Sequence, residues 1–281
     1  FRRKREYELA ESALERVTIR SPDDIMHAAV EMQREVRARN LHIMMWHNIG
    51  TLEPIRDPDG KSINRRIFGW NEDELSKITD TSHLSRSPLL RACRVESEPF
   101  WVNRQAVRTR WKNRTLDELQ LEDFERRSGT KAAIVLPIHL PLAQIGMAIL
   151  TSEDPNKTDL SEEFMQSAEW LLALARRFVD GYVRVSQVRN SLAIDASLTK
   201  RQIECLYWAA RGKTDWEIGE ILGCSHAGVR YHMVKASEAL DTTNRAQTIY
   251  HACLLGYLTF TDRRSETGRH LLSARNISVA S

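Results

Sequence analysis

The sequence is poor in cysteine, and the cysteines it has form no pattern. Four occur in 281 residues, none of them in a Cys-x-x-Cys pair: Cys93, Cys205, Cys224 and Cys253. This scatter argues against a zinc cluster or a disulfide framework and favours a reducing compartment. The nine histidines show no metal-ligand spacing either. We therefore expect no metal and no cofactor.

Long apolar segments and catalytic motifs are also missing. No apolar run approaches the roughly 18 residues that a membrane span needs. The basic stretch at residues 2–5 is not followed by the apolar core of a signal peptide. We therefore expect a cytoplasmic protein without membrane contact. Neither a Gly-x-Ser-x-Gly elbow nor a glycine-rich phosphate loop occurs, which disfavours an enzyme.

What the sequence does contain is a run of helix signals between Leu198 and Leu258. An amphipathic segment begins near Thr199 and ends at Gly212. A capping box follows at residues 214–217, and this second helix stops at Gly223. Residue 225 then offers the N-cap of a third helix that runs to about residue 240. Two helices joined by a three-residue turn predict a helix-turn-helix, although any small helical bundle would also show caps and apolar stripes.

In a helix-turn-helix, the N-terminal half of the second helix faces base edges in the major groove. Here that half is residues 226–231, in which small residues allow close approach and Arg230 suits bidentate contact with guanine. The residues predicted to contact DNA are Lys213, Thr214, Ser225, His226, Gly228, Arg230, Tyr231 and Lys235.

Bulk charge does not support nucleic-acid binding by this region. Between residues 198 and 262, seven Lys and Arg side chains stand against seven Asp and Glu side chains, so the net charge is zero. The prediction rests instead on placement, because Lys213, Arg230 and Lys235 gather around the turn and the third helix. A modest phosphate contribution implies that two copies bind DNA together.

Residues 198–258 resemble the LuxR-type helix-turn-helix almost position by position. The matching positions are 198–204, 212–214, 217–218, 221–223, 225, 229–232, 240 and 244–247. The resemblance implies a DNA-binding head of four helices. It also implies that the fourth helix, residues 245–255, serves dimerisation of the heads.

Residues 1–186 predict a mixed domain of helices and strands. One helix opens near Pro22, a helix-rich stretch covers 72–95, and a long helix runs from a cap at 159 to about 185. Strands are expected at 42–49, 66–70, 99–103, 132–140 and 145–152, the last two joined by a hairpin. Residues 187–197 are expected to be a linker, 198–262 the DNA-binding domain and 263–281 a disordered, arginine-rich tail.

Residues 70–150 resemble, less closely, the autoinducer-binding domain of LuxR-type quorum-sensing regulators. The resemblance lies in residues 87–91, in the aromatic pair at 100–101 and in the spacing of Gly129, Ala133 and Pro137. It implies an α+β protein: an α/β/α sandwich around an antiparallel sheet, followed by a small all-α domain. The residues expected to bind a signal molecule are Trp70, Ser87, Trp101, Trp46 and Ala133.

The departures from that family indicate a different ligand. Ser87 stands where acyl-homoserine-lactone receptors carry an aspartate, and Glu74 and Ile78 fall at the places of a tryptophan and a tyrosine. A neutral hydroxyl accepts an amide N–H more weakly than a carboxylate does. These departures predict a "solo" receptor tuned to another apolar molecule. A core role is the alternative for the tryptophans, and a turn or helix start is the alternative for Ser87.

Together these features predict a ligand-responsive, DNA-binding transcriptional regulator and not an enzyme. It would bind a small apolar signal other than an ordinary acyl-homoserine lactone and read promoter half-sites as a homodimer, with RNA polymerase as a further partner. Two alternatives are an acyl-homoserine-lactone-dependent activator and a signal-hydrolysing domain fused to a DNA-binding head. A third, the response regulator, is disfavoured because the acidic pair at residues 23–24 precedes a helix and does not end a strand.

Overall fold

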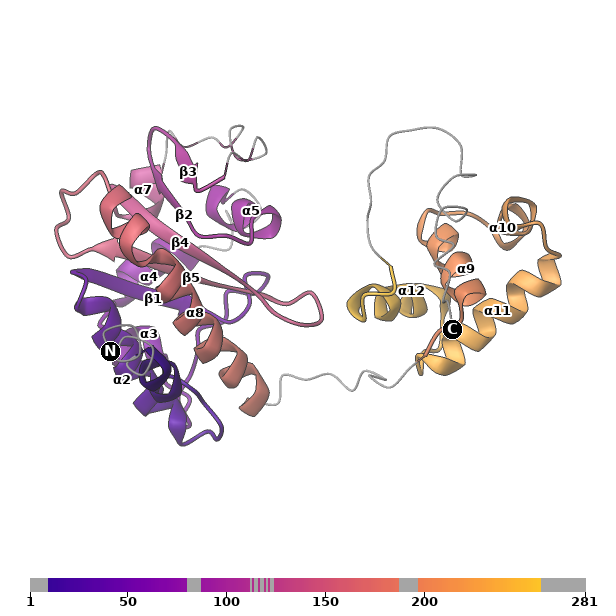
Figure 1. The fold of residues 1–281 in the computed structure, drawn as a ribbon, viewed down its shortest axis with the longest axis horizontal. Coiled ribbons are helices and arrows are strands. Elements are labelled where there is room, and N and C mark those ends of the chain that lie inside the picture. The colour runs from indigo at the N-terminus through magenta and orange to yellow at the C-terminus, as the bar shows by residue number, and fades with distance from the viewer. Residues whose placement is uncertain are drawn as a thin grey trace, which may run out of the picture. The chain divides into compact units, whose positions relative to one another are not determined.

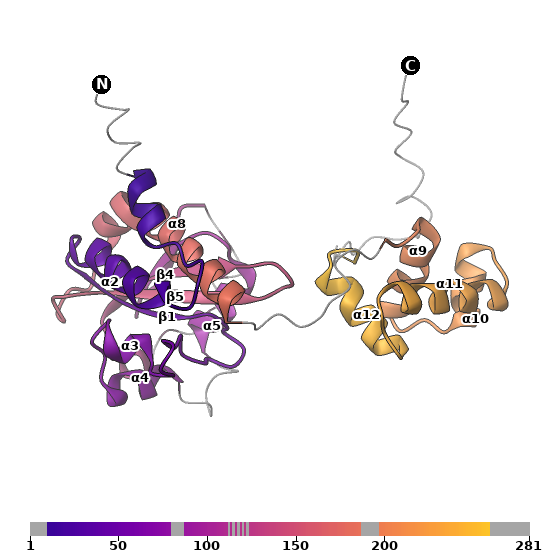
Figure 2. The same cartoon turned by 90° about the horizontal axis from the view of Figure 1, so that it is seen from below.

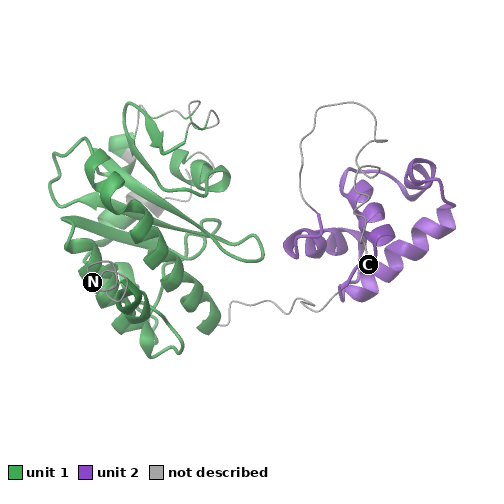
Figure 3. Cartoon of the chain, in the orientation of Figure 1, with its two compact units in different colours: residues 1–191 green, residues 192–281 purple. Residues whose placement is uncertain are grey.

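The computed structural model describes residues 10–79, 87–111, 124–186 and 197–258, together with 113, 116, 119 and 121. The chain divides into two units, Phe1–Ser191 and Leu192–Ser281 (Figure 3). The expected tail, residues 263–281, and the expected linker up to residue 196 lie outside the described residues. Among the described residues, no helix has the length and apolar character that crossing a membrane requires.

The first unit is built on one five-stranded sheet in the order β1-β5-β4-β2-β3 (Figure 1). The strands are β1 (Leu41–Trp46), β2 (Phe100–Asn103), β3 (Val107–Thr109), β4 (Ala132–His139) and β5 (Ile145–Ser152). Each pairs antiparallel with its neighbours. The fold class predicted from the sequence, a sandwich around an antiparallel sheet, is confirmed.

Helices cover both faces of this sheet (Figure 2). On one face α2 (Asp24–Arg37) and α8 (Ser161–Val185) pack on Ile43, Ile134 and Leu150. On the other, α5 (Pro88–Val95), α7 (Phe124–Ser128) and part of α4 (Glu72–Thr79) pack on Met44 and Val135. Because both faces are covered, β4 and β5 are continuous apolar runs and show no polar alternation.

The strand predicted at 66–70 is wrong. The segment begins in the short helix α3 (Ile63–Arg66), which lies beside β1, and then turns at Gly69, whose φ is +82°. The backbone N–H groups of Ile67 and Phe68 donate back to the carbonyl of Ile63, at 3.0 and 3.1 Å, and are not available to a neighbouring strand. The apolar pattern of this segment reflects burial of Phe68 in the core, which occurs here in a turn.

Strand β3 was not predicted. It has three residues, lies at the sheet edge beside β2 and is only partly buried, so it carries no apolar alternation from which it could be recognised.

The second unit consists of α9 (Lys200–Ala210), α10 (Asp215–Leu222), α11 (His226–Ala239) and α12 (Arg245–Leu254). These are the four helices that the sequence predicted. One apolar core joins them, and its fully buried members include Cys205, Leu206, Ile218 and Val229.

Candidate nucleic-acid interface and ligand cavity

Side-chain caps fix where α10 and α11 begin. The Thr214 hydroxyl accepts from the Glu217 N–H at 3.3 Å, and the Glu217 carboxylate accepts from the Thr214 N–H at 2.8 Å. The Ser225 hydroxyl accepts from the Gly228 N–H at 3.1 Å. Each bond satisfies a donor that the first turn of a helix leaves free. The predicted capping box and N-cap are therefore confirmed.

The turn between α10 and α11 is tight because two glycines allow it. Gly223 ends α10 in the left-handed conformation, with φ of +65°. Gly219, inside α10, lies so near the turn that a Cβ there would be 2.7 Å from the carbonyl oxygen of Cys224. The backbone N–H of Cys224 also donates to the carbonyl of Gly219 at 3.0 Å. This close approach sets the angle at which α11 leaves the turn.

Helix α11 has one buried and one exposed face. Val229, Met233 and Ala236 pack into the core. The exposed side chains recur at helical spacing along the opposite face: His226, Arg230, Tyr231, Val234 and Lys235. Among the described residues Arg230 has no hydrogen bond or ion pair, so its guanidinium is available to a ligand. The exposed face therefore contains the side chains that the sequence predicted for base contact.

The two predicted lysines already have partners. The Lys213 ammonium pairs with the Glu217 carboxylate at 2.8 Å, and Lys235 pairs with Glu238 at 2.6 Å. Both pairs are substantially exposed and screened by solvent, so a DNA phosphate can compete for the ammonium.

The ion pair and the cap together give Glu217 an unusual titration. The hydrogen bond from Lys213, followed by the bonds from Thr214, lowers the pKa of Glu217 from 4.5 to about 2. Because the folded pKa is depressed, the stabilisation is present above pH 4.5 and is lost as the pH falls toward 2. We expect the Glu217 carboxyl carbon to titrate near pH 2 by NMR, and the midpoint to rise in Lys213→Met. An unchanged midpoint in that variant would contradict the assigned cause.

The sequence did not single out Trp216, which is 68% exposed near the start of α10. It lines a surface hollow with Lys213, Thr214, His226 and Arg245. The Arg245 guanidinium bonds the Asp215 carboxylate and donates to the carbonyl of Lys213 at 2.7 Å, which ties α12 to the start of α10. Its exposure could have been predicted from the sequence, because Trp216 comes two residues after the Thr214 cap and does not belong to the apolar stripe of α10.

In the first unit the expected ligand-binding residues do not share one face. Trp46 and Ala133 are buried on the α5 face of the sheet. Trp101 is buried on the α2 and α8 face. Its neighbour Phe100 is buried on the same face as Trp46 and Ala133, although the sequence did not include it among the expected ligand-binding residues. Ser87 stands at the N-cap position of α5 without making a side-chain cap bond.

Trp46 and Trp70 do come together, on the wall of a cavity of about 850 Å³. The Trp70 indole N–H donates to the carbonyl of Ile43 at 2.6 Å, which holds the ring across the edge of β1. Leu52, Pro54 and Leu75 extend this apolar wall. The volume lies within the usual range for small-molecule sites.

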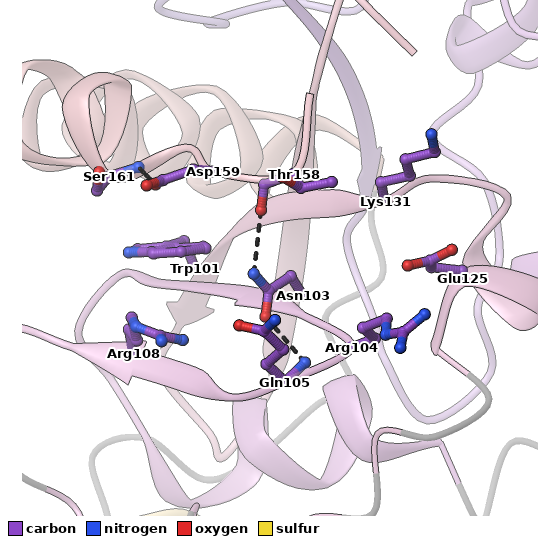
Figure 4. Close-up of a pocket in the computed structure, with 10 residues that line it drawn as sticks. All are labelled: Trp101, Asn103, Arg104, Gln105, Arg108, Glu125, Lys131, Thr158, Asp159 and Ser161. Atoms are coloured by element: carbon purple, nitrogen blue, oxygen red, sulfur yellow. Dashed lines mark hydrogen bonds between the residues drawn. The ribbon is translucent and has the colours of Figure 1, made fainter. Parts of the chain in front are cut away.

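Trp101 lines a different hollow, of about 710 Å³, shown in Figure 4. The Arg108 guanidinium lies 5.0 Å from the centre of its ring. The Asn103 side chain, in β2, donates to the carbonyl of Thr158 at 3.0 Å, which links β2 to the segment before α8. Most of the other side chains drawn there are exposed and polar, so this hollow lacks the apolar lining that the cavity at Trp70 has.

Glu74, at the place of the family's tryptophan, has a structural role. Its carboxylate accepts from the Asn71 N–H and its own N–H donates to the Asn71 side chain, both at 2.9 Å. This reciprocal pair caps α4. The side chain of Ile78 lies outside the described residues. No group of three or more His, Cys, Asp or Glu side chains that could hold a metal occurs in the described part of the chain.

Comparison with known proteins agrees with the geometry of the second unit. Residues 196–252 match the GerE family, described as "Bacterial regulatory proteins, luxR family". The second unit is therefore a DNA-binding domain of the luxR family.

Similarity to individual regulators extends beyond this domain. "Transcriptional activator protein LuxR" of Aliivibrio fischeri is 36% identical over 132 residues, 47% of this chain and 51% of that protein. VanR of Vibrio anguillarum is 32% identical over 133 residues, 47% and 54% of the two chains. The chain thus spans about half the length of these relatives. AhyR of Aeromonas hydrophila is 29% identical over 198 residues, 68% and 73% of the two chains.

Among solved structures, SdiA of Escherichia coli is 17% identical, with a TM-score of 0.47 over 90% of this chain and 99% of that chain. The matches to the luxR family and to its named activators confirm the predicted resemblance to LuxR-type quorum-sensing regulators. The named relatives are transcriptional activators.

Proposed function

We propose that the chain is a cytoplasmic, ligand-responsive transcriptional regulator that is not an enzyme. It binds a small apolar signal in its first unit and reads adjacent promoter half-sites as a homodimer, in contact with RNA polymerase. The observation that carries the DNA-binding part is the start of α11: a capped helix after a tight turn, with an exposed Arg230 free of protein partners among the described residues.

The cavity at Trp46 and Trp70 supports the sensing part of the proposal. An apolar body of a ligand would be stabilised there by burial against the two indole rings. A ligand that binds the folded unit stabilises it by mass action, which increases the population competent to dimerise. The two recognition helices of a dimer would then meet successive major grooves.

The test selects duplexes from a random pool with the full chain. We expect enrichment of a two-fold symmetric site whose half-sites lie about one helical turn, roughly 10 base pairs, apart. An asymmetric site, or no enrichment in any ligand condition, would overturn the dimeric DNA-binding proposal.

The second candidate is an activator that depends on ordinary acyl-homoserine lactones, as the resemblance to LuxR-type quorum-sensing regulators implies. Ser87 and Glu74 argue against it, because neither supplies the contact expected at its position. Calorimetry with N-octanoyl-homoserine lactone separates the two candidates. Sub-micromolar binding supports the second candidate, and weak or absent binding supports the first.

A further inference from the structure

The cavity at Trp70 has one wall that is polar and built by a turn. Asp57-Pro58-Asp59-Gly60 is a strong turn sequence, and it folds back so that Arg56 pairs with Ser62 in a β-bridge. The Asp57 N–H donates to the Lys61 carbonyl at 2.9 Å, and the Lys61 N–H donates to the Asp57 carboxylate at 2.8 Å. This turn places Arg56, Lys61 and Ser62 in the lining of the same cavity as Trp46 and Trp70.

The Ser62 hydroxyl has no partner in this wall. Its Oγ is buried and makes no hydrogen bond among the described residues. Ser62 occupies the N-cap position of α3, where a serine oxygen ordinarily accepts from the helix backbone, yet this bond is not made. Buried hydroxyls are almost always hydrogen-bonded, so Ser62 has a hydrogen-bonding capacity that the described protein atoms leave unused.

Two of the four cations that line the cavity are already neutralised. The Arg66 guanidinium bonds the buried carboxylate of Asp57 and lies 3.2 Å from that of Asp59. Arg65 pairs with Glu72, the one carboxylate among the described lining residues, at 3.1 Å.

The other two cations have no carboxylate partner. Arg56 donates from Nη1 to the carbonyl of Gly60 at 2.7 Å, which orients the guanidinium but does not neutralise it. Neither Arg56 nor Lys61 forms an ion pair with any carboxylate that the structure describes. The polar wall therefore carries an uncompensated positive charge beside an unsatisfied hydroxyl.

We infer that the ligand is an amphipathic organic acid. Its apolar chain or ring lies against Trp46 and Trp70, and its carboxylate lies near Lys61 and Arg56 and accepts a hydrogen bond from Ser62. This inference rests on the proposed function for the position of the signal site and adds its chemical class. A neutral lactone would fill the apolar part but gain nothing from the two exposed cations.

The test is calorimetry of the full chain with decanoate and with methyl decanoate, which have the same apolar chain and differ in charge. We expect decanoate to bind about tenfold more tightly than the ester. In the double variant Lys61→Gln/Arg56→Gln that preference is expected to disappear, while binding of the ester stays the same. Ser62→Ala should weaken both ligands. Arg91→Gln, which removes an exposed cation that does not line the cavity, is the matched control and should change nothing.

Equal affinity for acid and ester, or an unchanged preference in the double variant, would overturn the inference. So would the absence of decanoate binding while methyl decanoate binds and alters binding to the selected duplex, and in that case the proposed function stands. A different result would count against the proposed function: decanoate binds the chain, but DNA binding is the same at every decanoate concentration. Circular dichroism of each variant shows whether the fold is retained.

Discussion

Gly219→Val is expected to destabilise the DNA-binding unit by at least about 2 kcal/mol and to abolish specific DNA binding. Glycine inside a helix normally costs about 1 kcal/mol relative to alanine, so helix propensity alone would predict a gain on substitution. The structure reverses the sign, because the new Cβ would lie 2.7 Å from the Cys224 carbonyl oxygen. This is a backbone atom, and it cannot move without reorienting α11.

Hydrogen–deuterium exchange of peptides from residues 197–258, read by mass spectrometry, measures this loss within the second unit. Gly228→Ala is the matched control: its Cβ meets only the Ser225 hydroxyl, at 3.4 Å, so protection should be unchanged or slightly increased. Equal protection in Gly219→Val and the unchanged protein would contradict the close approach at the turn.

Arg230→Ala is expected to weaken specific DNA binding by about 1–3 kcal/mol while leaving the fold intact. The side chain is exposed on α11, and no described residue depends on it for a hydrogen bond, so its removal leaves no buried group unsatisfied. The loss should be largest on the selected site and small on unrelated DNA, since base contacts carry sequence discrimination and phosphate contacts do not.

Binding isotherms on the selected duplex and on a scrambled duplex measure both quantities. Lys200→Ala removes a cation of the same unit at the start of α9 and should leave the discrimination between the two duplexes unchanged. An equal loss on both duplexes in Arg230→Ala would assign Arg230 to phosphate binding, contrary to the prediction.

The sequence was sufficient where structure is decided locally. Caps at Thr214 and Ser225 and the stop at Gly223 depend on bonds within four residues, so short-range spacing located α10 and α11 correctly. The exposed face of α11 followed from helical period once its start was known. The wrong strand prediction was also local in origin: residues 66–70 have the composition of a strand, but the N–H groups of Ile67 and Phe68 donate to the carbonyl of Ile63.

The ligand site could not be predicted from short-range spacing in the sequence. A strand has a side-chain period of two, so a shift of one position moves a residue to the other face, and this is why Phe100 and not Trp101 joins Trp46 on the α5 face. The turn at 57–60 was visible in the sequence as Asp-Pro-Asp-Gly. That it brings Lys61 and Ser62 into the lining of the cavity at Trp70 depends on packing between segments with no fixed spacing.

The amino-acid sequence by itself determined the helix-turn-helix, its caps, its exposed arginine and the family of the second unit, because each follows from periodicity and hydrogen bonding over a few residues. Only the tertiary structure decided which face of the sheet each aromatic residue serves, which cations keep an unpaired charge and where a ligand has room. Those properties depend on strand register and on which carboxylates fold back to reach which cations, and contacts between distant segments set both.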